Sequence, residues 1–178
     1  MVRGPVPADA MPAPRPVLVR NDEHAPQEDT ADATPAPQPD APVIVTDQGF
    51  AADDWSHPVT PLAEFSGPTG PVTAIEIGPE DDPQLLARHL PEIDMIRVRF
   101  PSFSDGRGFT HARQLRLMGF QGRLRAAGPV IADQYAMARR SGFDEVEIPA
   151  ELARRQPWPQ WQRRANWRAH DYQSRLRA

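Results

Sequence analysis

Residues 96–148 read IRVRFPSFSDGRGFTHARQLRLMGFQGRLRAAGPVIADQYAMARRSGFDEVEI, in which short apolar runs alternate with longer amphipathic ones. Short runs with apolar residues at every second position predict strands, and longer runs with apolar residues three or four positions apart predict helices. The glycines and the Asp-Gly-Arg-Gly turn fall where the connections are expected. This order predicts repeated strand–helix units, which build a parallel sheet with right-handed crossovers.

The expected strands are residues 72–77, 94–100, 121–126 and 146–148, and the expected helices are residues 83–89, 110–118 and 130–141. Asp82 is placed to cap the first helix, with Pro83 at its first position, and Thr110 is placed to cap the second. Gly119 and Gly142 are placed to end the other two helices. We therefore expect an α/β fold with a small, mostly parallel sheet of about four strands and flanking helices. Such a sheet is either an open three-layer sheet or part of a β/α barrel, since four strands are too few for closure.

The N-terminal part of the chain is divided by composition into two segments. Residues 1–42 are rich in Pro, Ala and Asp and lack aromatic residues, so we expect a disordered arm. Residues 43–71 contain scattered Pro and Gly, which predicts an irregular arm that packs on the core. A short strand is an option at residues 43–45, and Trp55 and Phe65 are the expected anchors.

The α/β domain is expected to span residues 72–150, and residues 151–178 to form a C-terminal Arg/Trp-rich helix. Trp161 and Tyr172 recur at helical spacing in this segment, so they are expected to dock on the sheet with arginines on the remaining surface. The alternatives are docking onto an acidic partner, or contact with nucleic acid or a membrane, for which interleaved arginine and aromatic residues are weak evidence.

Composition excludes several kinds of chemistry. The 178 residues include no cysteine, which removes thiolate nucleophiles, thiolate zinc sites and cysteine-ligated iron–sulfur clusters within this chain. All 20 basic residues are arginine, so lysine Schiff bases are excluded too. No apolar run approaches the ~18 residues of a membrane span, and we expect a soluble cytoplasmic protein. Nine arginines against three acids lie within residues 94–140, and seven against two within residues 151–178.

A candidate site follows from the predicted topology, because ligands of open parallel sheets bind beyond the carboxyl ends of the strands. Glycines there let backbone amides approach an anion, and arginines offer paired donors to a sulfur oxyanion or a phosphate. The predicted small-anion crevice comprises Ser104, Asp105, Gly106, Arg107, Gly108, Arg113, Arg125, Asp133 and Gln134.

These residues also have purely structural interpretations, which the sequence leaves open. Asp105 and Gly106 suit a tight turn, and the arginines suit surface charges or partners of Glu145 and Glu147. Asp133 suits the first turn of a helix, where the helix dipole favours a carboxylate.

Other sites have little support in the sequence. The third glycine of a dinucleotide fingerprint beginning at Gly106 would fall on His111, whose side chain would obstruct a pyrophosphate. Neither a flavin nor a nicotinamide cofactor is supported by any other residue. His89 and His111 have no further ligands at suitable spacing, so no metal site is expected. No catalytic constellation stands out, and the catalytic residues are unknown.

Three blocks of the sequence, FPSFSDGRGFTHARQLR, GFQGRLRAAGPVIADQ and MARRSGFDEVEI, resemble the bacterial domain-of-unknown-function family 934 over residues 72–148. Members of that family often accompany assimilatory sulfite reductase and are described as oxidoreductases involved in sulfite reduction. The resemblance therefore implies a pathway rather than a reaction, and it carries over no catalytic residue. One departure is His111, where the family pattern leads us to expect a small hydroxyl-bearing or polar residue.

Two hypotheses about function follow. The first is a noncatalytic accessory of assimilatory sulfite reduction that binds the sulfite reductase hemoprotein or its electron donor. The pathway in this hypothesis comes from the resemblance, and the lack of cysteine denies the chain a thiolate-ligated redox centre. The second is an oxidoreductase or other enzyme that acts on a small anionic substrate between Asp105 and Arg125.

Overall fold

The computed structural model describes residues 41–68 and 70–170, all within one compact unit, Asp32–Ala178. The predicted disordered arm, apart from its last two residues, and Tyr172 lie outside the described residues.

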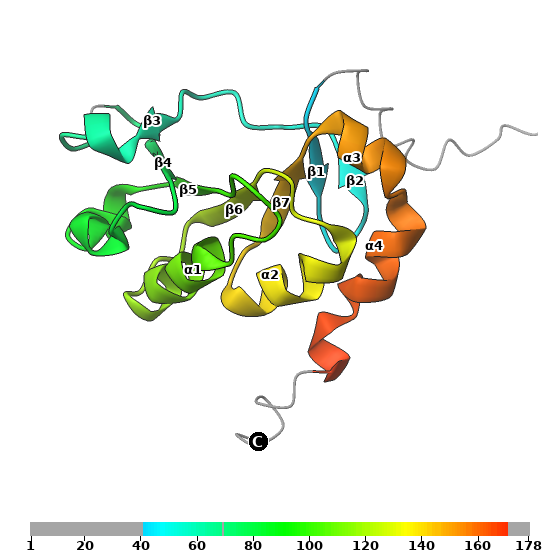
Figure 1. Cartoon of the computed structure of the whole chain (residues 1–178). Helices are drawn as coiled ribbons and strands as arrows, with labels where there is room; N and C mark the ends of the chain where they lie inside the picture. The colour runs from blue at the N-terminus through cyan, green and yellow to red at the C-terminus, as the bar shows by residue number, and fades with distance from the viewer. Residues whose placement is uncertain (1–40, 69, 171–178) are drawn as a thin grey trace, which may run out of the picture. The chain divides into compact units, whose positions relative to one another are not determined.

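The core of the fold is a mixed sheet of seven strands in the order β2-β1-β7-β6-β5-β4-β3 (Figure 1). The strands are β1 (Val43–Val45), β2 (Phe50–Ala51), β3 (Thr60–Pro61), β4 (Ala74–Ile77), β5 (Met95–Arg99), β6 (Arg123–Ala127) and β7 (Glu145–Ile148). Strands β3 to β7 are parallel, whereas β1 runs antiparallel to both β7 and β2. The α/β class is confirmed, but the expected sheet of about four mostly parallel strands is wrong, because the sheet is larger and mixed.

The three additional strands come from the segment that was expected to be irregular. All three residues of β1 are buried, and Ile44 pairs with Glu147, more than a hundred positions along the chain. A three-residue apolar run is too short to predict a strand by periodicity, so its pairing depends on the exposed edge that β7 offers. At the other edge, β3 ends in Pro61, a residue that suits an edge strand because it has no N–H to donate.

The helices occupy the connections between the parallel strands and the C-terminal segment. They are α1 (Arg107–Leu117), α2 (Tyr135–Ser141), α3 (Ala150–Arg155) and α4 (Trp158–Ala165). Shorter 3-10 helices are η1 (Leu62–Glu64), η2 (Pro83–Leu86), η3 (Leu90–Glu92), η4 (Ala132–Gln134) and η5 (Trp167–His170).

Asp82 and the two predicted terminal glycines act as expected, whereas Thr110 lies inside α1 and does not cap it. The Asp82 side chain accepts a hydrogen bond of 2.9 Å from the Gln84 amide at the start of η2. Gly119 and Gly142, with φ of +95° and +112°, follow α1 and α2. After each glycine comes a buried phenylalanine, Phe120 or Phe143, whose amide bonds back five residues to the last turn of the helix. Both helices thus end in the same glycine-dependent motif, which satisfies their terminal carbonyl groups.

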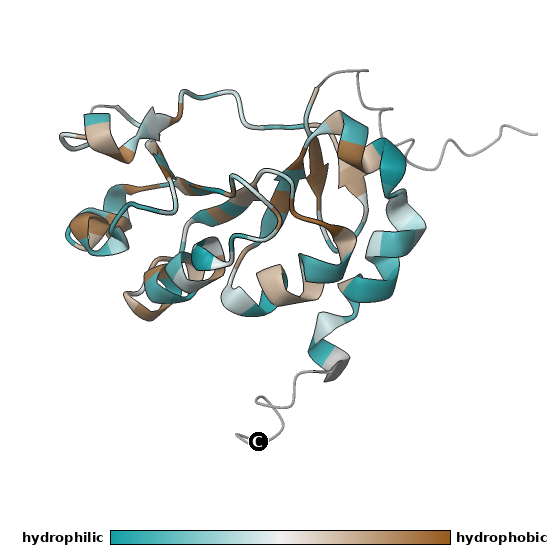
Figure 2. Cartoon of the chain, in the orientation of Figure 1, coloured by the Kyte–Doolittle hydropathy of each residue, from teal (hydrophilic) through white to brown (hydrophobic). Residues whose placement is uncertain are grey.

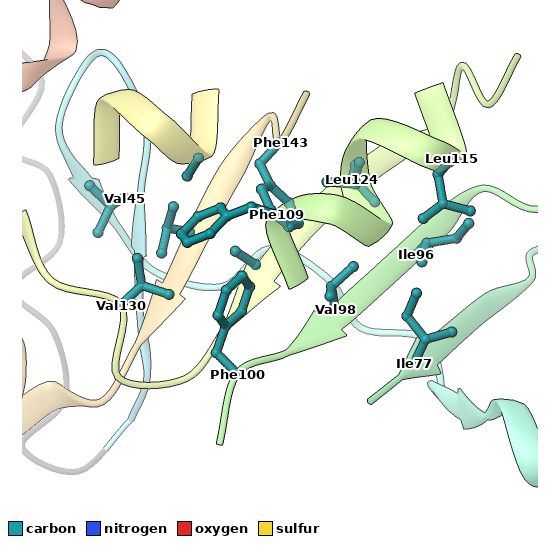
Figure 3. Packing of buried hydrophobic residues seen from close by; sticks show 14 of the residues in the cluster. Val45, Ile77, Ile96, Val98, Phe100, Phe109, Leu115, Leu124, Val130 and Phe143 are labelled. Atoms are coloured by element: carbon teal, nitrogen blue, oxygen red, sulfur yellow. The ribbon is translucent and has the colours of Figure 1, made fainter. Parts of the chain in front are cut away.

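Helices α1 and α2 cover the same face of the sheet (Figure 1). The parallel strands from β4 to β7 are neighbours in chain order, and right-handed crossovers between such strands place every connection on one face. The sheet is open, with β2 and β3 at its edges. Apolar side chains of β5, such as Ile96 and Val98, lie beneath α1 (Figure 3), and Phe100, Phe109 and Phe143 form a cluster of rings 5.0–6.4 Å apart.

Helix α4 packs its aromatic side chains against α2 and the β1–β2 hairpin. Trp161 is fully buried, and its ring meets those of Phe50 and Tyr135 edge to face at 6.2 and 5.8 Å. The expected docking of Trp161 is confirmed. Outside this contact α4 is mostly hydrophilic, in contrast to the apolar β1 (Figure 2). Among the described residues, no helix has both the length and the apolar character needed to cross a bilayer.

The turn after β1 is held by one carboxylate that sequence reasoning missed. Asp47 accepts hydrogen bonds from the Tyr135 hydroxyl at 2.8 Å, from Arg139 at 3.1 Å and from the Trp167 indole at 3.2 Å. Burial works to raise the pKa of Asp47, but these donors prevail and lower it below its usual value. One side chain therefore ties β1 to both α2 and η5.

Candidate functional site

The face of the sheet opposite α1 and α2 is charged. Side chains alternate between the two faces of a strand, so the neighbours of the core residues point to this second face. We call the following residues the charged sheet face: Glu76, Arg97, Arg99, Arg123, Arg125, Glu145 and Glu147. Glu76, Arg97, Arg125 and Glu145 lie in register across β4, β5, β6 and β7. Opposite charges therefore meet between β4 and β5 and again between β6 and β7.

Arg125 lies at the centre of the charged sheet face and is almost completely buried. Its guanidinium is 2.5 Å from Glu145 and 3.3 Å from Glu147, and it forms two parallel hydrogen bonds of 2.7 and 2.8 Å with Asp53. Burial works to lower the pKa of Arg125, but the bonds to Asp53 and the charge of Glu145 outweigh it and raise the pKa. The alternative that arginines pair with Glu145 and Glu147 is confirmed for Arg125.

Arg97 is the second point where charges converge. Two of its nitrogens bond the carboxylate of Glu147 at 2.6 and 2.9 Å, and a third contacts Glu76. Hydrogen bonding to Glu147 is the main reason that the pKa of Arg97 is raised, although burial opposes the shift. Arg97 lies on β5, next to β4, and its side chain reaches across β6 to Glu147 on β7. It therefore links β4 and β7 through their glutamates.

Residues 52–59 join β2 to β3 and pass across the side of the sheet opposite α1 and α2 (Figure 1); we call them the covering segment. Besides the clamp between Asp53 and Arg125, Asp54 lies 2.6 Å from Arg123. Burial works to raise the pKa of Asp53, but bonds from Arg125 and the Trp55 amide lower it overall. The pKa of Asp54 is lowered chiefly by its hydrogen bond with Arg123.

A pocket of about 450 Å³ lies where the charged sheet face reaches the carboxyl ends of the parallel strands. Its lining includes Arg97 and Glu147 from the sheet, Gly128 just after β6, and Glu151 and Arg154 from α3. The pocket therefore lies at the edge where the ligands of open parallel sheets bind, but none of the predicted crevice residues lines it.

The loop after β5 is held by its own side chains. Asp105 accepts hydrogen bonds from the Arg107 amide at 3.1 Å and from the Arg107 guanidinium at 2.7 and 3.0 Å. The guanidinium also contacts Glu80 from the loop after β4. Hydrogen bonding from Arg107 lowers the pKa of Asp105 to about 2. Helix α1 begins at Arg107 rather than at the expected residue 110, because the Asp105 carboxylate accepts a hydrogen bond from the first amide of the helix. The Ser104 hydroxyl lies 2.8 Å from that of Ser102.

The other predicted residues are dispersed. The side chain of Gln134 donates to the Phe103 carbonyl at 2.6 Å, so the loops after β5 and β6 do converge. Asp133 pairs at 2.7 Å with Arg164 of α4, and Arg113 is exposed on α1. Arg125 lies on the charged sheet face, with the sheet between it and α1. The structure thus brings together the loop residues and Gln134, but not Arg113 or Arg125.

His111 is held within the fold on α1. It is 9% exposed, and its Nδ1 is buried without a hydrogen-bond partner. Burial lowers its pKa, opposed mainly by the charge of Asp81. Within residues 41–68 and 70–170, no group of His, Asp and Glu side chains is placed to hold a metal ion.

Sequence reasoning missed most of the charged sheet face. A signal was present, since arginines at 97 and 99, arginines at 123 and 125, and glutamates at 145 and 147 each recur with the period of two that places side chains on one face of a strand. The partners Asp53 and Asp54 had no such signal, because they lie outside the predicted elements.

The two glycines of the loop have different surroundings. A Cβ at Gly108 would lie 2.4 Å from the Phe100 ring, whereas one at Gly106 would meet nothing within 4 Å. The lack of a side chain at Gly108 is therefore explained by packing.

We expect Gly108→Ala to lower the free energy of unfolding by about 1–3 kcal/mol through overpacking, even after alanine's gain of up to ~1 kcal/mol in helix propensity. Gly106→Ala is the matched control and should change it by less than ~0.5 kcal/mol. Urea unfolding of both variants measures the difference. Equal stability of the two variants would contradict the packing explanation.

Comparison with known proteins gives one match. A family model described as a bacterial protein of unknown function (DUF934) matches residues 74–178, more than half of the chain. No curated protein and no solved structure matches the chain. The matched residues contain β4 to β7, helices α1 to α4 and every residue of the predicted crevice. The chain is a member of the DUF934 family of bacterial proteins.

Proposed function

We propose that this protein is a noncatalytic accessory of assimilatory sulfite reduction, which assists sulfite reductase or its electron supply by binding an acidic surface of the partner through α3 and α4. The pathway rests on the resemblance of the three sequence blocks to their family. The mode of action rests on the separation of apolar and basic residues in the C-terminal segment.

That separation is the observation that carries the proposal. Helix α4 buries Trp161, while Arg163 and Arg164 are exposed. Residues 150–168 contain five arginines, all exposed, and a single acidic residue, Glu151. The ordered helices thus hold a basic surface whose charge is not needed to pack the core. Such a surface steers and orients an acidic partner more than it adds raw affinity.

Two ion pairs within this surface are exposed. Arg164 pairs with Asp133 at 2.7 Å, and Arg155 lies 3.6 Å from Glu151, with both members of each pair at least half exposed. Exposed pairs of this kind contribute little to stability. Arg168 stacks 4.4 Å from the centre of the Trp167 ring, which orients its guanidinium without neutralising it.

The alternative proposal, an oxidoreductase or other enzyme acting on a small anion between Asp105 and Arg125, rests on sequence alone. Arg107 already binds Asp105 and Glu80, and Arg125 lies on the opposite face of the sheet. No observation on the charged face singles out a reaction, and the alternative stays a prediction.

Deletion of the gene tests the pathway directly. We expect the deletion strain to grow poorly on sulfate or sulfite and to recover with sulfide. Rescue by sulfite would place the defect earlier in the pathway. Unimpaired growth on sulfate would contradict the whole proposal.

The binding surface is tested by replacing Arg163, Arg164 and Arg168 with glutamine. We expect the triple variant to bind purified sulfite reductase, or its electron donor, at least ~10-fold more weakly than the parent at low salt. The difference should shrink at 0.5 M salt, because exposed charges are screened within ~10 Å already at 0.1 M. Surface plasmon resonance at two salt concentrations measures both effects.

A variant with Arg88 and Arg113 replaced by glutamine serves as the control, since both arginines are exposed but lie outside α3 and α4. It should bind like the parent. If the triple variant also binds like the parent at low salt, the basic surface is not the docking site.

A further inference from the structure

We propose that Arg123 and Arg125 form a binding site for a small dianion, which the covering segment closes by placing the carboxylates of Asp53 and Asp54 on the two guanidinium groups. This site lies on the charged sheet face and is separate from the partner surface of α3 and α4. The inference does not depend on the pathway proposed above.

The spacing of the two arginines suits a single small ligand. Arg123 and Arg125 are two positions apart on β6 and point to the same face. Residues so placed are separated by about 7 Å along a strand. Asp53 and Asp54, which are adjacent in sequence, supply one carboxylate to each. A small molecule with two anionic groups can present the same pair of charges.

The contact with Arg125 has the geometry of ligand recognition. Both oxygens of Asp53 are engaged, with Oδ1 2.7 Å from Nη2 and Oδ2 2.8 Å from Nη1. This arrangement of two parallel bonds is the one in which arginine binds the carboxylate or oxyanion of a ligand. Glu145 holds the Nε side of the same guanidinium at 2.5 Å, so the fork that faces Asp53 is oriented by the sheet itself.

The covering segment is held to the sheet by these charges and by the partly buried Trp55. It is attached at its ends by two strands of two residues each, and the apolar anchors Phe50 and Phe65 lie outside it. Asp54 is 70% exposed. The Trp55 indole nitrogen is buried without a hydrogen-bond partner, so the closed state leaves one desolvated donor unsatisfied.

Glu145 pairs with Arg123 at 2.6 and 2.8 Å as well as with Arg125, so an anion is attracted by the overall charge of the charged sheet face once the segment moves away. Its four arginines outnumber its three glutamates, so the uncovered face carries a net charge of +1. Asp53 and Asp54 change this to −1 when they bind. Glu147, which contacts Arg125 at 3.3 Å, also lines the 450 Å³ pocket, so solvent reaches close to the site even when the segment is closed.

Isothermal titration of the full chain with succinate and with sulfate tests the proposal. The variant Asp53→Asn/Asp54→Asn removes the competing carboxylates, whose effective concentration in the parent is of millimolar order or higher. We expect the variant to bind at least one of the two probes at least ~10-fold more tightly than the parent. Adding Arg123→Gln to the variant should abolish this gain, which a general loosening of the fold would not do.

The probes distinguish the kinds of dianion. A gain for succinate alone indicates a dicarboxylate site, and a gain for sulfate indicates a site for a compact oxyanion. Acetate is the control, because a monoanion cannot bridge both arginines; an equal gain for acetate would overturn the dianion assignment. No gain for any probe would show that the segment is a structural cover.

Should the double variant fail to fold, as judged by its thermal unfolding, Asp54→Asn alone replaces it, since this residue is largely exposed. The gain should then be smaller but still depend on Arg123. Its absence in a folded Asp54→Asn variant would overturn the proposal equally.

Discussion

Trp161→Ala should lower the free energy of unfolding by about 3–5 kcal/mol, the range for removal of a fully buried large aromatic side chain. Trp161 has no exposed surface, packs against Phe50 and Tyr135, and donates from its indole nitrogen to the Gln156 carbonyl at 2.8 Å. Alanine would leave a cavity between α4 and α2 and would remove the donor. Urea or guanidinium unfolding with an unchanged m-value measures the loss.

Leu117→Ala is the control for this prediction, because Leu117 is 77% exposed at the end of α1. It should shift the free energy of unfolding by less than ~0.5 kcal/mol. A loss below ~1 kcal/mol for Trp161→Ala would mean that α4 is docked only loosely, and the separation of packing from charge on that helix would no longer hold.

Arg125→Ala should also be harmful, with a loss of about 3 kcal/mol, the lower end of the range for breaking a buried ion pair, because Asp53 loses its clamp while Glu145 keeps Arg123 and Glu147 keeps Arg97. Arg125 is the shared partner of Glu145, Glu147 and Asp53. Without it, two glutamates within the sheet and the covering segment lose their common positive charge. The same unfolding measurement tests this expectation.

Arg99→Ala is the matched control on the same face. The Arg99 side chain is 56% exposed and lies 3.6 Å from Glu76, so its loss should cost less than ~1 kcal/mol. If the two variants are equally stable, the charged sheet face is solvated in solution and Arg125 is not held as the structure shows.

Local chemistry determined much of the fold from the sequence alone. The parallel strand–helix units, the cap at Asp82 and the helix ends at Gly119 and Gly142 depend on residues within a few positions of one another, and the structure contains each of them. The docking of Trp161 was predictable for the same reason, since its place on one side of a helix follows from spacing. The family resemblance depends on the same contiguous blocks.

Predictions about the site were less complete, because they assumed that every chemically suggestive residue near the strand ends faces one crevice. Arg107 and Asp105 do lie in such a loop. Arg125 lies two positions from the end of β6. Its side chain points to the face of the sheet opposite α1 and α2, since successive side chains on a strand alternate between the two faces. The period of two was visible in the sequence, but it cannot say which face the helices will cover.

The residues of the sequence thus determined the strand–helix units, the ends of α1 and α2 and the separation of apolar from basic residues in α4, because each of these is a short-range property. Only the tertiary structure decided that β1 pairs with β7, that α1 and α2 share one face, and that Asp53 and Asp54 cross the other to meet Arg125 and Arg123. These contacts join positions about 70 to 105 residues apart. Their formation depends on which strand edges and charged side chains the folded sheet leaves unpaired. A local sequence pattern does not contain that information.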